Sequence, residues 1–342
     1  MANSNLLNAK RAKQDEFYTQ LSDIEKEMGA YLEYNPDVFK GKTILLPCDD
    51  PEWSNFTKYF VLHFQEFGIK KLISTSFNGG ERGKILVLDG TSGGCVNVGD
   101  IEWNYLEGDG DFRSAEVTTL RDEADFVITN PPFSLFREFM AWVFEGNCKF
   151  SVLGNMNAVT YKEIFPLIKE NRMWPGQEFN KSMNFAIPSE YFIQEGSEEV
   201  DSLGRNIVKV PAICWFTNIT HGKRNEPLSL MTKADNERFN KTVTGNIYAY
   251  KEYDNYKAIE VPSVSAIPSD YKGIMGVPIS FLTKYCPEQF EILGIDFEVK
   301  EGTLGFLKKE GYTGKVDRGY IDGRRKYSRI LIRHIANGAP EG

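Results

Sequence analysis

The segment Asn130–Phe133 contains the residues of this chain best suited to chemistry, an amide and an aromatic ring on either side of two prolines. It follows the apolar run Phe126–Thr129, whose β-branched residues predict a buried strand. Because prolines cannot donate hydrogen bonds to a sheet, the strand must end at Asn130. Ser134 is the predicted N-cap of an amphipathic helix over 135–144. This order of strand, rigid turn and helix is typical of sites at the carboxyl edge of an open α/β sheet.

An amide beside two prolines and an aromatic ring suits the activation of an exocyclic ring amine, such as that of adenine. The lone pair of this amine is delocalised into the ring, and two acceptors that bind its hydrogens draw it towards tetrahedral geometry. Asn130 would supply one acceptor and the carbonyl of Pro131 the other, with the backbone fixed by Pro131 and Pro132. Phe133 would stack on a base that has left the duplex. Taken alone, the segment is also compatible with a strand terminator and an incidental asparagine.

The turn after the first predicted strand, Thr43–Leu46, contains two carboxylates, Asp49 and Asp50, and no glycine. A glycine-rich phosphate loop is therefore not indicated. A cofactor with an amine and ribose hydroxyls suits two carboxylates, and S-adenosylmethionine has both. Asp111 and Phe112 form a second pair that could meet the edge and face of an adenine. Acidic loops at strand ends are often plain turns, so each signal is weak by itself.

Length and composition indicate a water-soluble chain of about two domains. The 342 residues are 41% hydrophobic and 26% charged, and no stretch approaches the roughly 20 apolar residues of a membrane span. The N-terminus lacks the apolar segment of a secretory signal. Five cysteines without a Cys-x-x-Cys pair, and only three histidines, favour reduced thiols and argue against a metal site. We therefore expect a cytoplasmic, metal-free protein, and a monomer.

The net charge of −8 argues against a nucleic-acid partner, since such proteins usually carry a basic surface. Local positive potential matters more than total charge, however. The region 315–333 holds seven Lys or Arg residues against two Asp. The candidate DNA contacts within it are Arg324, Arg325, Lys326 and Arg329. An ordinary solvated face is an equally good interpretation of this region.

Strands and helices are predicted to alternate up to residue 222. The expected helices cover 8–28, ending before Asn35-Pro36, and residues near 161–169, and a hairpin insertion is expected over 92–106. A further helix is predicted from an aromatic stripe that should face the core: Trp53, Phe56, Phe60, Phe64 and Phe67. The expected strands are 43–46, 72–77, 85–88, 126–129, 150–153, 183–187 and 212–217. We predict an α/β fold with a Rossmann-like, doubly wound, mainly parallel seven-stranded sheet. A separate C-terminal region follows, with short strands near 290–299 and 327–332.

Taken together, these segments resemble the EcoRI-type adenine-specific DNA methyltransferases. The resemblance runs through nearly the whole chain in the same order, on the segments 15–19, 48–56, 108–114, 129–138, 155–161, 215–218, 275–279 and 287–290. It implies S-adenosylmethionine as the methyl donor. The implied acceptor is the 6-amino group of a flipped adenine in a specific duplex DNA site, and the implied role is modification in a restriction-modification system. It also implies a catalytic domain over 1–222 and a target-recognition region over 223–342.

The resemblance assigns roles to several residues outside the Asn130–Phe133 segment. Phe17, Tyr18 and Thr19 align with the segment that holds the methionine part of the cofactor. Asp49 and Asp50 align with the usual glycine-rich motif, and Asp111 with Phe112 aligns with the contact to the cofactor adenine. Asn130 would contact both cofactor and target. Either Trp215 or Phe216 aligns with the position at which such enzymes place a second aromatic ring against the flipped base. The strand over 72–77 lacks the acidic residue that commonly binds the ribose, so that contact has no assigned residue.

Two other interpretations remain open. The same site could methylate the 4-amino group of cytosine or a protein glutamine amide, because these nitrogens pose the same chemical problem. The chain could also be a catalytically silent DNA-binding relative. The basic C-terminal stretch favours DNA over protein, and the intact Asn130–Phe133 segment favours catalysis. The recognised base sequence cannot be predicted from the chain.

Overall fold

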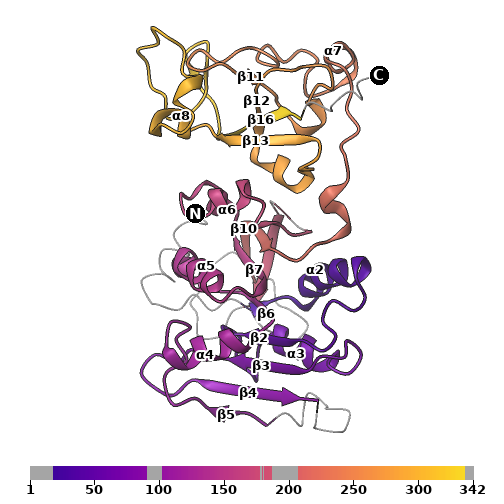
Figure 1. Ribbon diagram of the computed structural model, residues 1–342, viewed down its shortest axis with the longest axis vertical. Coiled ribbons are helices and arrows are strands. Elements are labelled where there is room, and N and C mark those ends of the chain that lie inside the picture. The colour runs from indigo at the N-terminus through magenta and orange to yellow at the C-terminus, as the bar shows by residue number, and fades with distance from the viewer. Residues whose placement is uncertain (1–17, 91–101, 178, 180, 187–206, 336–342) are drawn as a thin grey trace, which may run out of the picture. The chain divides into compact units, whose positions relative to one another are not determined.

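The computed structural model describes residues 18–90, 102–177, 179, 181–186 and 207–335 (Figure 1). The chain forms two compact units. The first unit comprises residues 1–158 and 173–222, and the second comprises 159–172 and 223–342. The segment 159–172, which the sequence analysis counted with the first domain, thus belongs to the second unit. No helix among the described residues is long and apolar enough to cross a membrane.

The first unit contains one mixed sheet. Its strands are β1 (Tyr18–Thr19), β2 (Thr43–Leu46), β3 (Lys71–Thr75), β4 (Lys84–Asp89), β5 (Asn104–Tyr105), β6 (Phe126–Thr129), β7 (Lys149–Asn155), β8 (Trp174–Pro175), β9 (Lys181–Ala186) and β10 (Ile207–Thr217). Among the described residues these ten strands follow the order β1-β9-β10-β7-β6-β2-β3-β4-β5, and β8 pairs with β10. Neighbours within β7-β6-β2-β3 are parallel, and the remaining pairs are antiparallel.

The predicted α/β class is confirmed, but the prediction of a mainly parallel, seven-stranded sheet is wrong. Only the four central strands run parallel, and both flanks are antiparallel. The connection between β3 and β4, residues 76–83, is too short for the crossover that a parallel pair needs. Strand periodicity shows which segments pair in a sheet but not the direction in which they pair.

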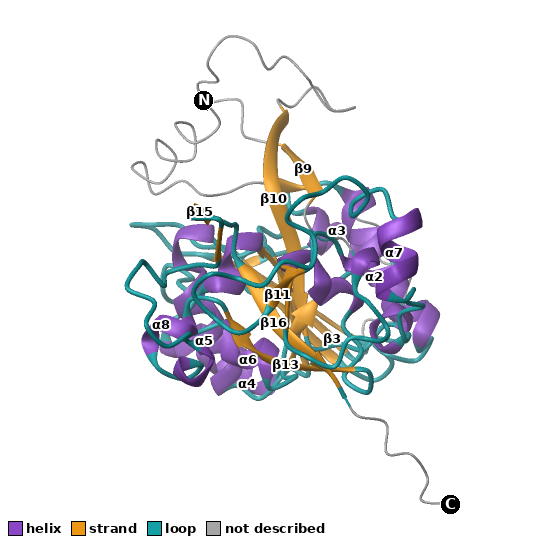
Figure 2. Ribbon diagram, turned by 90° about the horizontal axis from the view of Figure 1, so that it is seen from above, coloured by secondary structure: helices purple, strands orange, loops and turns teal. Residues whose placement is uncertain are grey.

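Helices cover both faces of this sheet. They are α2 (Leu21–Tyr34), α3 (Asn55–Leu62), α4 (Ala115–Glu123) and α5 (Phe136–Glu145). Figures 1 and 2 show α2 and α3 on one side of the strands and α4 and α5 on the other. Because both faces are covered, every residue of β2 and of β6 is buried, which explains their continuous apolar runs.

Three predicted local features need correction. Helix α2 begins at Leu21, within the predicted 8–28, and stops at the predicted Asn35, while residues 1–17 lie outside the described part. Ser134 does not cap α5, because it lies within the 3₁₀ turn Phe133–Leu135, in which the Leu135 amide binds the Pro132 carbonyl at 2.9 Å and the Phe136 amide binds the Phe133 carbonyl. Of the aromatic stripe, Trp53 is 56% exposed. It lies in the turn before α3 rather than on the core-facing side of the helix.

The rest of that stripe and the predicted hairpin can also be located. Phe56, Phe60 and Phe64 are buried in the core, as predicted, and Phe67 packs against it. Of the hairpin expected over 92–106, residues 91–101 lie outside the described part. The short strand β5 pairs antiparallel with β4.

The second unit has a smaller sheet of four strands in the order β11-β12-β16-β13 and a two-stranded ribbon, β14-β15. The elements are α6 (Phe165–Lys169), α7 (Lys233–Phe239), α8 (Glu298–Glu301), β11 (Ile259–Glu260), β12 (Met275–Pro278), β13 (Phe290–Ile295), β14 (Tyr320–Ile321), β15 (Arg324–Arg325) and β16 (Arg329–His334). The core of this unit contains Tyr253, Tyr256 and Leu331. Inside it, Arg329 pairs with Glu260 at 2.5 Å, and Tyr253 donates a hydrogen bond to the same carboxylate.

Candidate active site

The candidate active site lies at the carboxyl edge of the parallel strands. Strand β2 lies between β3 and β6 and runs parallel to both. The residues that follow these strands therefore meet at one edge, as in other open α/β sheets. Asp49 follows β2, and Asn130 follows β6. The structure thus brings together the two segments that the sequence analysis singled out first.

Asp49 forms hydrogen bonds at this edge through both its side chain and its backbone. Its Oδ1 accepts a hydrogen bond from the Ser54 hydroxyl at 2.7 Å, and its Oδ2 accepts one from the Thr129 hydroxyl at 2.5 Å. Its backbone amide donates to the Thr75 carbonyl at 2.9 Å, and its carbonyl accepts from the Ser74 hydroxyl at 2.5 Å. Only 4% of the Asp49 surface is exposed. One residue therefore joins β2, β3, β6 and the N-terminus of α3, where Ser54 caps the Phe56 amide.

The environment of Asp49 changes its acidity. Burial raises the pKa of the Asp49 carboxyl to about 7, while hydrogen bonds from Thr129 and Ser54 act in the opposite direction. The neighbouring Asp50 carboxylate adds a small upward shift to this pKa. Such a group changes its protonation near neutral pH.

Asp50 faces another direction. Its side chain pairs with Lys84 of β4 at 3.2 Å and is 19% exposed. Lys84 also binds Glu52, whose own amide donates to Asp50 Oδ1 at 2.8 Å. Asp50 is thus the more accessible of the two predicted cofactor carboxylates.

The segment Asn130–Phe133 leaves the sheet directly after β6. Asn130 is partly buried, with its side-chain oxygen inside the protein, and Pro131 is buried. Phe133 packs against the core of the first unit. Its role as a stacking platform and the acceptor role of Asn130 stay predictions.

The predicted segment for the methionine part of the cofactor reaches the same region through α3. Asn55, the first residue of α3, donates a hydrogen bond to the Thr19 carbonyl at 2.7 Å. Tyr18 and Thr19 form β1, which pairs with β9. Phe17 lies outside the described residues.

The loop that carries Asp111 and Phe112 packs against the end of β3. A side chain at Gly110, which has φ +82°, would lie 2.1 Å from the Ser76 carbonyl, so only glycine fits there. Asp111 pairs with Arg113 at 2.7 Å, and hydrogen bonds from Arg113 lower the pKa of the Asp111 carboxyl. Phe112 is 4% exposed.

The Phe112 ring contacts two rings of α5. The ring centroids lie 5.1 Å from Phe139 and 5.6 Å from Trp142. This ring belongs to the packing between the loop and α5. Its contact with a cofactor adenine stays a prediction.

Trp215 and Phe216 are both fully buried in β10. As consecutive strand residues they face opposite sides of the sheet. Trp215 contacts Phe56 of α3 with ring centroids 5.8 Å apart, and Phe216 contacts Phe136 of α5 at 5.3 Å. Neither ring is open to solvent in this structure, so base stacking by either stays a prediction.

Sequence reasoning did not find the hydroxyl partners of Asp49. Ser54, Ser74 and Thr129 are all buried side chains. The sequence offers two signals. Ser54, five residues after Asp49, is a typical N-cap residue, and Thr129 is the last strand residue before Asn130. Neither signal identifies a partner, because the pairing depends on strand order.

The four basic candidates of the second unit have different surroundings. Arg324 and Arg325 form the exposed strand β15, and Lys326 follows them. Arg324 donates to the Tyr248 hydroxyl at 2.9 Å, and Lys326 lies over the same ring. Arg325 pairs with Asp317 at 2.8 Å. The Arg329 side chain, by contrast, is 11% exposed and held by Glu260, so it is not placed to contact DNA.

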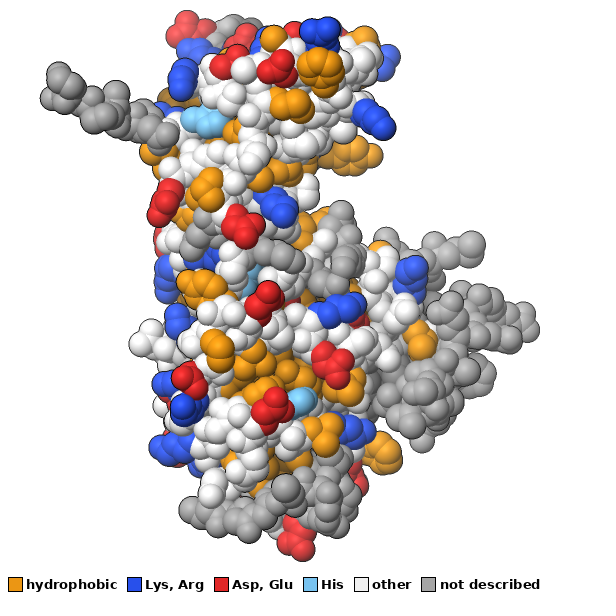
Figure 3. Space-filling view, turned by 90° about the vertical axis from the view of Figure 1, so that its right-hand side faces the viewer, with side chains coloured by type: hydrophobic (Ala, Val, Ile, Leu, Met, Phe, Trp, Pro, Cys, Tyr) orange, Lys and Arg blue, Asp and Glu red, His pale blue; other side chains and the backbone are white. Residues whose placement is uncertain are grey.

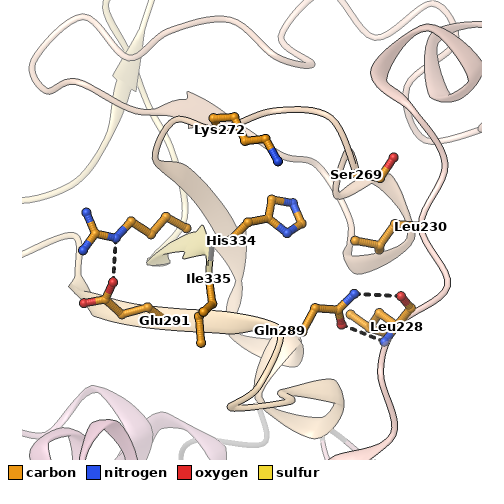
Figure 4. A pocket seen from close by; sticks show the side chains of 9 residues that line it. Leu228, Leu230, Ser269, Lys272, Gln289, Glu291, His334 and Ile335 are labelled. Carbon is orange, nitrogen blue, oxygen red and sulfur yellow. Dashed lines mark hydrogen bonds and ion pairs between the residues drawn. The ribbon is translucent and has the colours of Figure 1, made fainter. Parts of the chain in front are cut away.

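The second unit also contains a hollow of about 720 Å³ that sequence reasoning did not find (Figure 4). It is lined by Leu228, Leu230, Ser269, Lys272, Gln289, Glu291, Arg333, His334 and Ile335. Arg333 pairs with Glu291 at 2.6 Å, whereas Lys272 has no carboxylate partner among the described residues. His334 Nε2 lies 2.8 Å from the Pro268 carbonyl. Since a carbonyl only accepts, Nε2 carries the hydrogen in this contact. The hollow therefore offers a cation and a polar ring.

Comparisons with known proteins connect this geometry with a family. The family model described as "Adenine-specific methyltransferase EcoRI" matches residues 5–335. The chain belongs to this family. It is 38% identical to the "Type II methyltransferase M.EcoRI" of Escherichia coli, with 97% of each chain covered. It is 37% identical to M.MpnI of Mycoplasma pneumoniae, with 96% of this chain and 98% of the relative covered.

A third relative, M.MgeORF184P of Mycoplasma genitalium, is 34% identical, with 95% of this chain and 97% of the relative covered. No solved structure matches the chain significantly. The resemblance proposed from the sequence is thus confirmed, and the family match extends over both units. Among the described residues, no cluster of three or more His, Cys, Asp or Glu side chains could hold a metal ion.

Proposed function

We propose that this member of the EcoRI methyltransferase family transfers a methyl group from S-adenosylmethionine to the 6-amino group of adenine in a specific duplex DNA site. Its role would be protective modification in a restriction-modification system. The observation that carries the proposal is the hydrogen bond from Thr129 to Asp49, which joins the Asn130–Phe133 segment to the turn after β2. A methyl transferase needs its donor beside the segment that binds the amine. The adenine-specific description of the family supports the choice of base.

The residues of the first unit fit S-adenosylmethionine. The Thr19 hydroxyl and the Gln20 amide nitrogen are buried, and neither has a hydrogen-bond partner within the described structure. Buried polar atoms without partners are costly, which favours a polar ligand at this place. We assign the methionine part of the cofactor to Tyr18, Thr19 and Phe17, the last of which lies outside the described residues, and the ribose or amine to Asp50. The adenine contact is assigned to Asp111 and Phe112.

The Asn130–Phe133 segment would supply the chemistry of the acceptor. When bound, S-adenosylmethionine provides a methyl group on a sulfonium, which is already a good leaving group. Asn130 and the Pro131 carbonyl would hold the adenine amine, and Pro132 keeps the backbone rigid. Phe133 would stack on the flipped base, with Trp215 or Phe216 as the second aromatic. Catalysis then consists of positioning and electrostatics, without a covalent enzyme intermediate.

The second unit would bind DNA through local positive charge. On the face seen in Figure 3, basic and acidic side chains are interspersed. The excess negative charge of the chain, −8 in total, is therefore not concentrated on this face. We assign phosphate or groove contacts to Arg324, Arg325 and Lys326, which lie on or beside the exposed strand β15. Lys272 in the hollow is a further candidate. Residues 223–342 would thus act as the target-recognition region.

Other features support further parts of the proposal. One chain contains all the proposed site segments, which supports a monomer. An enzyme that modifies cellular DNA would act in the cytoplasm. Methylation of cytosine or of a glutamine amide, and a silent DNA-binding role, are disfavoured by the family description and by the intact Asn130–Phe133 segment.

The proposal is tested by incubating the purified protein with methyl-labelled S-adenosylmethionine and genomic duplex DNA. We expect label in 6-methyladenine after nucleoside analysis. Label only in 4-methylcytosine or in protein would contradict the proposal. Sequencing of the treated DNA with detection of modified bases would give the recognised site.

A further inference from the structure

The inference concerns Asp49, whose carboxylate the sequence analysis assigned to the cofactor. Both of its oxygens are engaged by protein hydroxyls, one from Ser54 at 2.7 Å and one from Thr129 at 2.5 Å. The residue is 4% exposed. Its carboxylate therefore faces into the protein, unlike the more accessible Asp50.

The hydrogen bond between Asp49 and Thr129 links β2 and β6 beyond the last backbone pair of these two strands. The described pairs between β2 and β6 end at Leu45 and Val127. Thr129 lies two residues further on, and the prolines after Asn130 have no amide hydrogen for a ladder. The Asp49–Thr129 hydrogen bond therefore connects the turn after β2 to the residue that precedes the Asn130–Phe133 segment.

Asp49 is itself fixed by a buried network. The Ser74 hydroxyl binds the Asp49 carbonyl at 2.5 Å and the Thr57 hydroxyl at 2.7 Å. Ser74 and Thr57 have no exposed surface. A buried polar network of this kind stabilises one geometry when its members are satisfied. The carboxylate is thus held against β3 and α3 while it binds Thr129.

We propose that Asp49 is a positioning residue that holds Asn130 in place for catalysis by binding Thr129, and that it does not contact the cofactor. This inference rests on the proposed function, because it acts through Asn130. It changes the assignment of Asp49 from binding to positioning. It also gives Thr129 and Ser54 a role that the family description does not state.

A matched pair of variants at Thr129 tests the inference. Thr129→Val keeps the shape of the side chain but removes its hydroxyl, and Thr129→Ser keeps the hydroxyl. We expect Thr129→Val to lower kcat by about 10-fold, in line with the loss of one buried hydrogen bond. Thr129→Ser should recover most of that rate. The KM for S-adenosylmethionine should change less than about 3-fold in both, as expected for loss of an interaction that does not bind cofactor.

A double-mutant comparison separates positioning from general stability. If Thr129 acts through Asn130, then Thr129→Val should cause no further loss of rate in an Asn130→Ala background. Equal fold-losses in both backgrounds would overturn the inference, as would a normal kcat for Thr129→Val. Thermal unfolding sets an assay temperature at which every variant is folded.

Cofactor binding gives a readout that does not depend on activity. Calorimetry with S-adenosylmethionine should give Asp49→Asn an affinity within about 3-fold of the wild type, whereas loss of a charged contact would weaken it by roughly 10-fold or more. Such a loss would overturn the positioning role. Should Asp49→Asn fail to fold, Asp49→Ser, which also removes the carboxylate, serves the same measurement. A folded wild type that methylates no adenine removes the proposed function, whereas an active wild type with an unaffected Thr129→Val removes only this inference.

Discussion

Phe133 meets Phe185 of β9 edge to face, with ring centroids 6.4 Å apart and ring planes at 82°. The aromatic residue of the Asn130–Phe133 segment is therefore oriented by a strand that is distant in sequence. Edge-to-face packing is a favourable geometry for aromatic pairs. It fixes the direction of the Phe133 ring before any base arrives.

For Phe133 we predict a loss of base capture without a loss of duplex binding. A duplex with 2-aminopurine at the target adenine should brighten when wild-type protein binds, because the fluorophore leaves the stack. Phe133→Ala should weaken this capture by about 1–3 kcal/mol. Phe133→Leu is the control, since it keeps an apolar contact with the core but has no ring. Normal brightening with Phe133→Leu would show that the ring does not stack on the base.

For Asn130 we predict a selective loss of turnover. Asn130→Ala removes the proposed acceptor for the adenine amine, so the methylation rate should fall by at least ~10²-fold. Cofactor affinity, measured by calorimetry, should change much less. Asn78→Ala is the matched control, because Asn78 is an exposed asparagine of the same unit. Similar rates for both variants would refute the role of Asn130.

For the β15 ribbon we predict a change in salt dependence. Each phosphate contact contributes about 0.9 to the slope of log affinity against log salt concentration. The double variant Arg324→Ala, Arg325→Ala should bind duplex DNA more weakly and with a shallower slope, while cofactor binding stays the same. A loss of affinity for the recognised sequence alone would instead indicate a base contact, and this loss should be about 1–3 kcal/mol. Unchanged affinity and slope on cognate and scrambled duplexes would mean that DNA binds elsewhere.

For Arg329 we predict an effect on stability. Arg329→Met leaves the Glu260 carboxylate buried, at 5% exposure, without its ion-pair partner. Removal of one partner from a buried pair typically lowers the free energy of unfolding by about 3–5 kcal/mol. Denaturant unfolding should show this loss, whereas Arg324→Met, at an exposed position, should stay within about 0.5 kcal/mol of the wild type. Equal stability of the two variants would contradict the structural role of Arg329.

For Asp49 we predict a pH-dependent contribution to stability. Its pKa is raised to about 7 in the folded protein, above the usual value near 4. Between these values the folded state binds a proton that the unfolded state lacks, so stability falls as pH rises, by at most about 1.4 kcal/mol per pH unit. The fall should end above the folded pKa.

Asp49→Asn has no titrating group at this position, so the stability of the wild type relative to this variant should decrease from pH 5 to pH 7. Urea unfolding of both proteins across this range measures the difference. The buried Asp296, whose pKa burial raises to about 6, is present in both and cancels. A difference that does not vary with pH would contradict the raised pKa of Asp49.

The elements that the sequence predicted well have local signals. Strand β2 matches its prediction at both ends, because an apolar run meets Pro47. Helix α2 stops at Asn35, before a proline, for the reason expected. The Ser134 cap does not form because the Phe133 carbonyl accepts from the Phe136 amide, one of the amides that a Ser134 cap would bind.

The features that the sequence could not predict depend on distant pairing. Asp49 and Asp50 are adjacent in a turn, where no periodic pattern shows which carboxylate faces inward. Arg329 looked like one member of a basic surface, but its partner Glu260 is 69 residues away in the chain. The antiparallel flanks of the sheet depend on strand order in the same way.

The Asp49–Thr129 hydrogen bond joins residues 80 positions apart in the chain. During synthesis, the turn after β2 emerges long before its partner in β6. A nascent chain that ends within α4 would contain Asp49 but neither Thr129 nor the central strand that carries it. Contacts of this range also slow folding, because a long loop must close before they form. The edge of the sheet can therefore assemble only after β6 has been made, so a nascent chain that ends before Thr129 would lack this link.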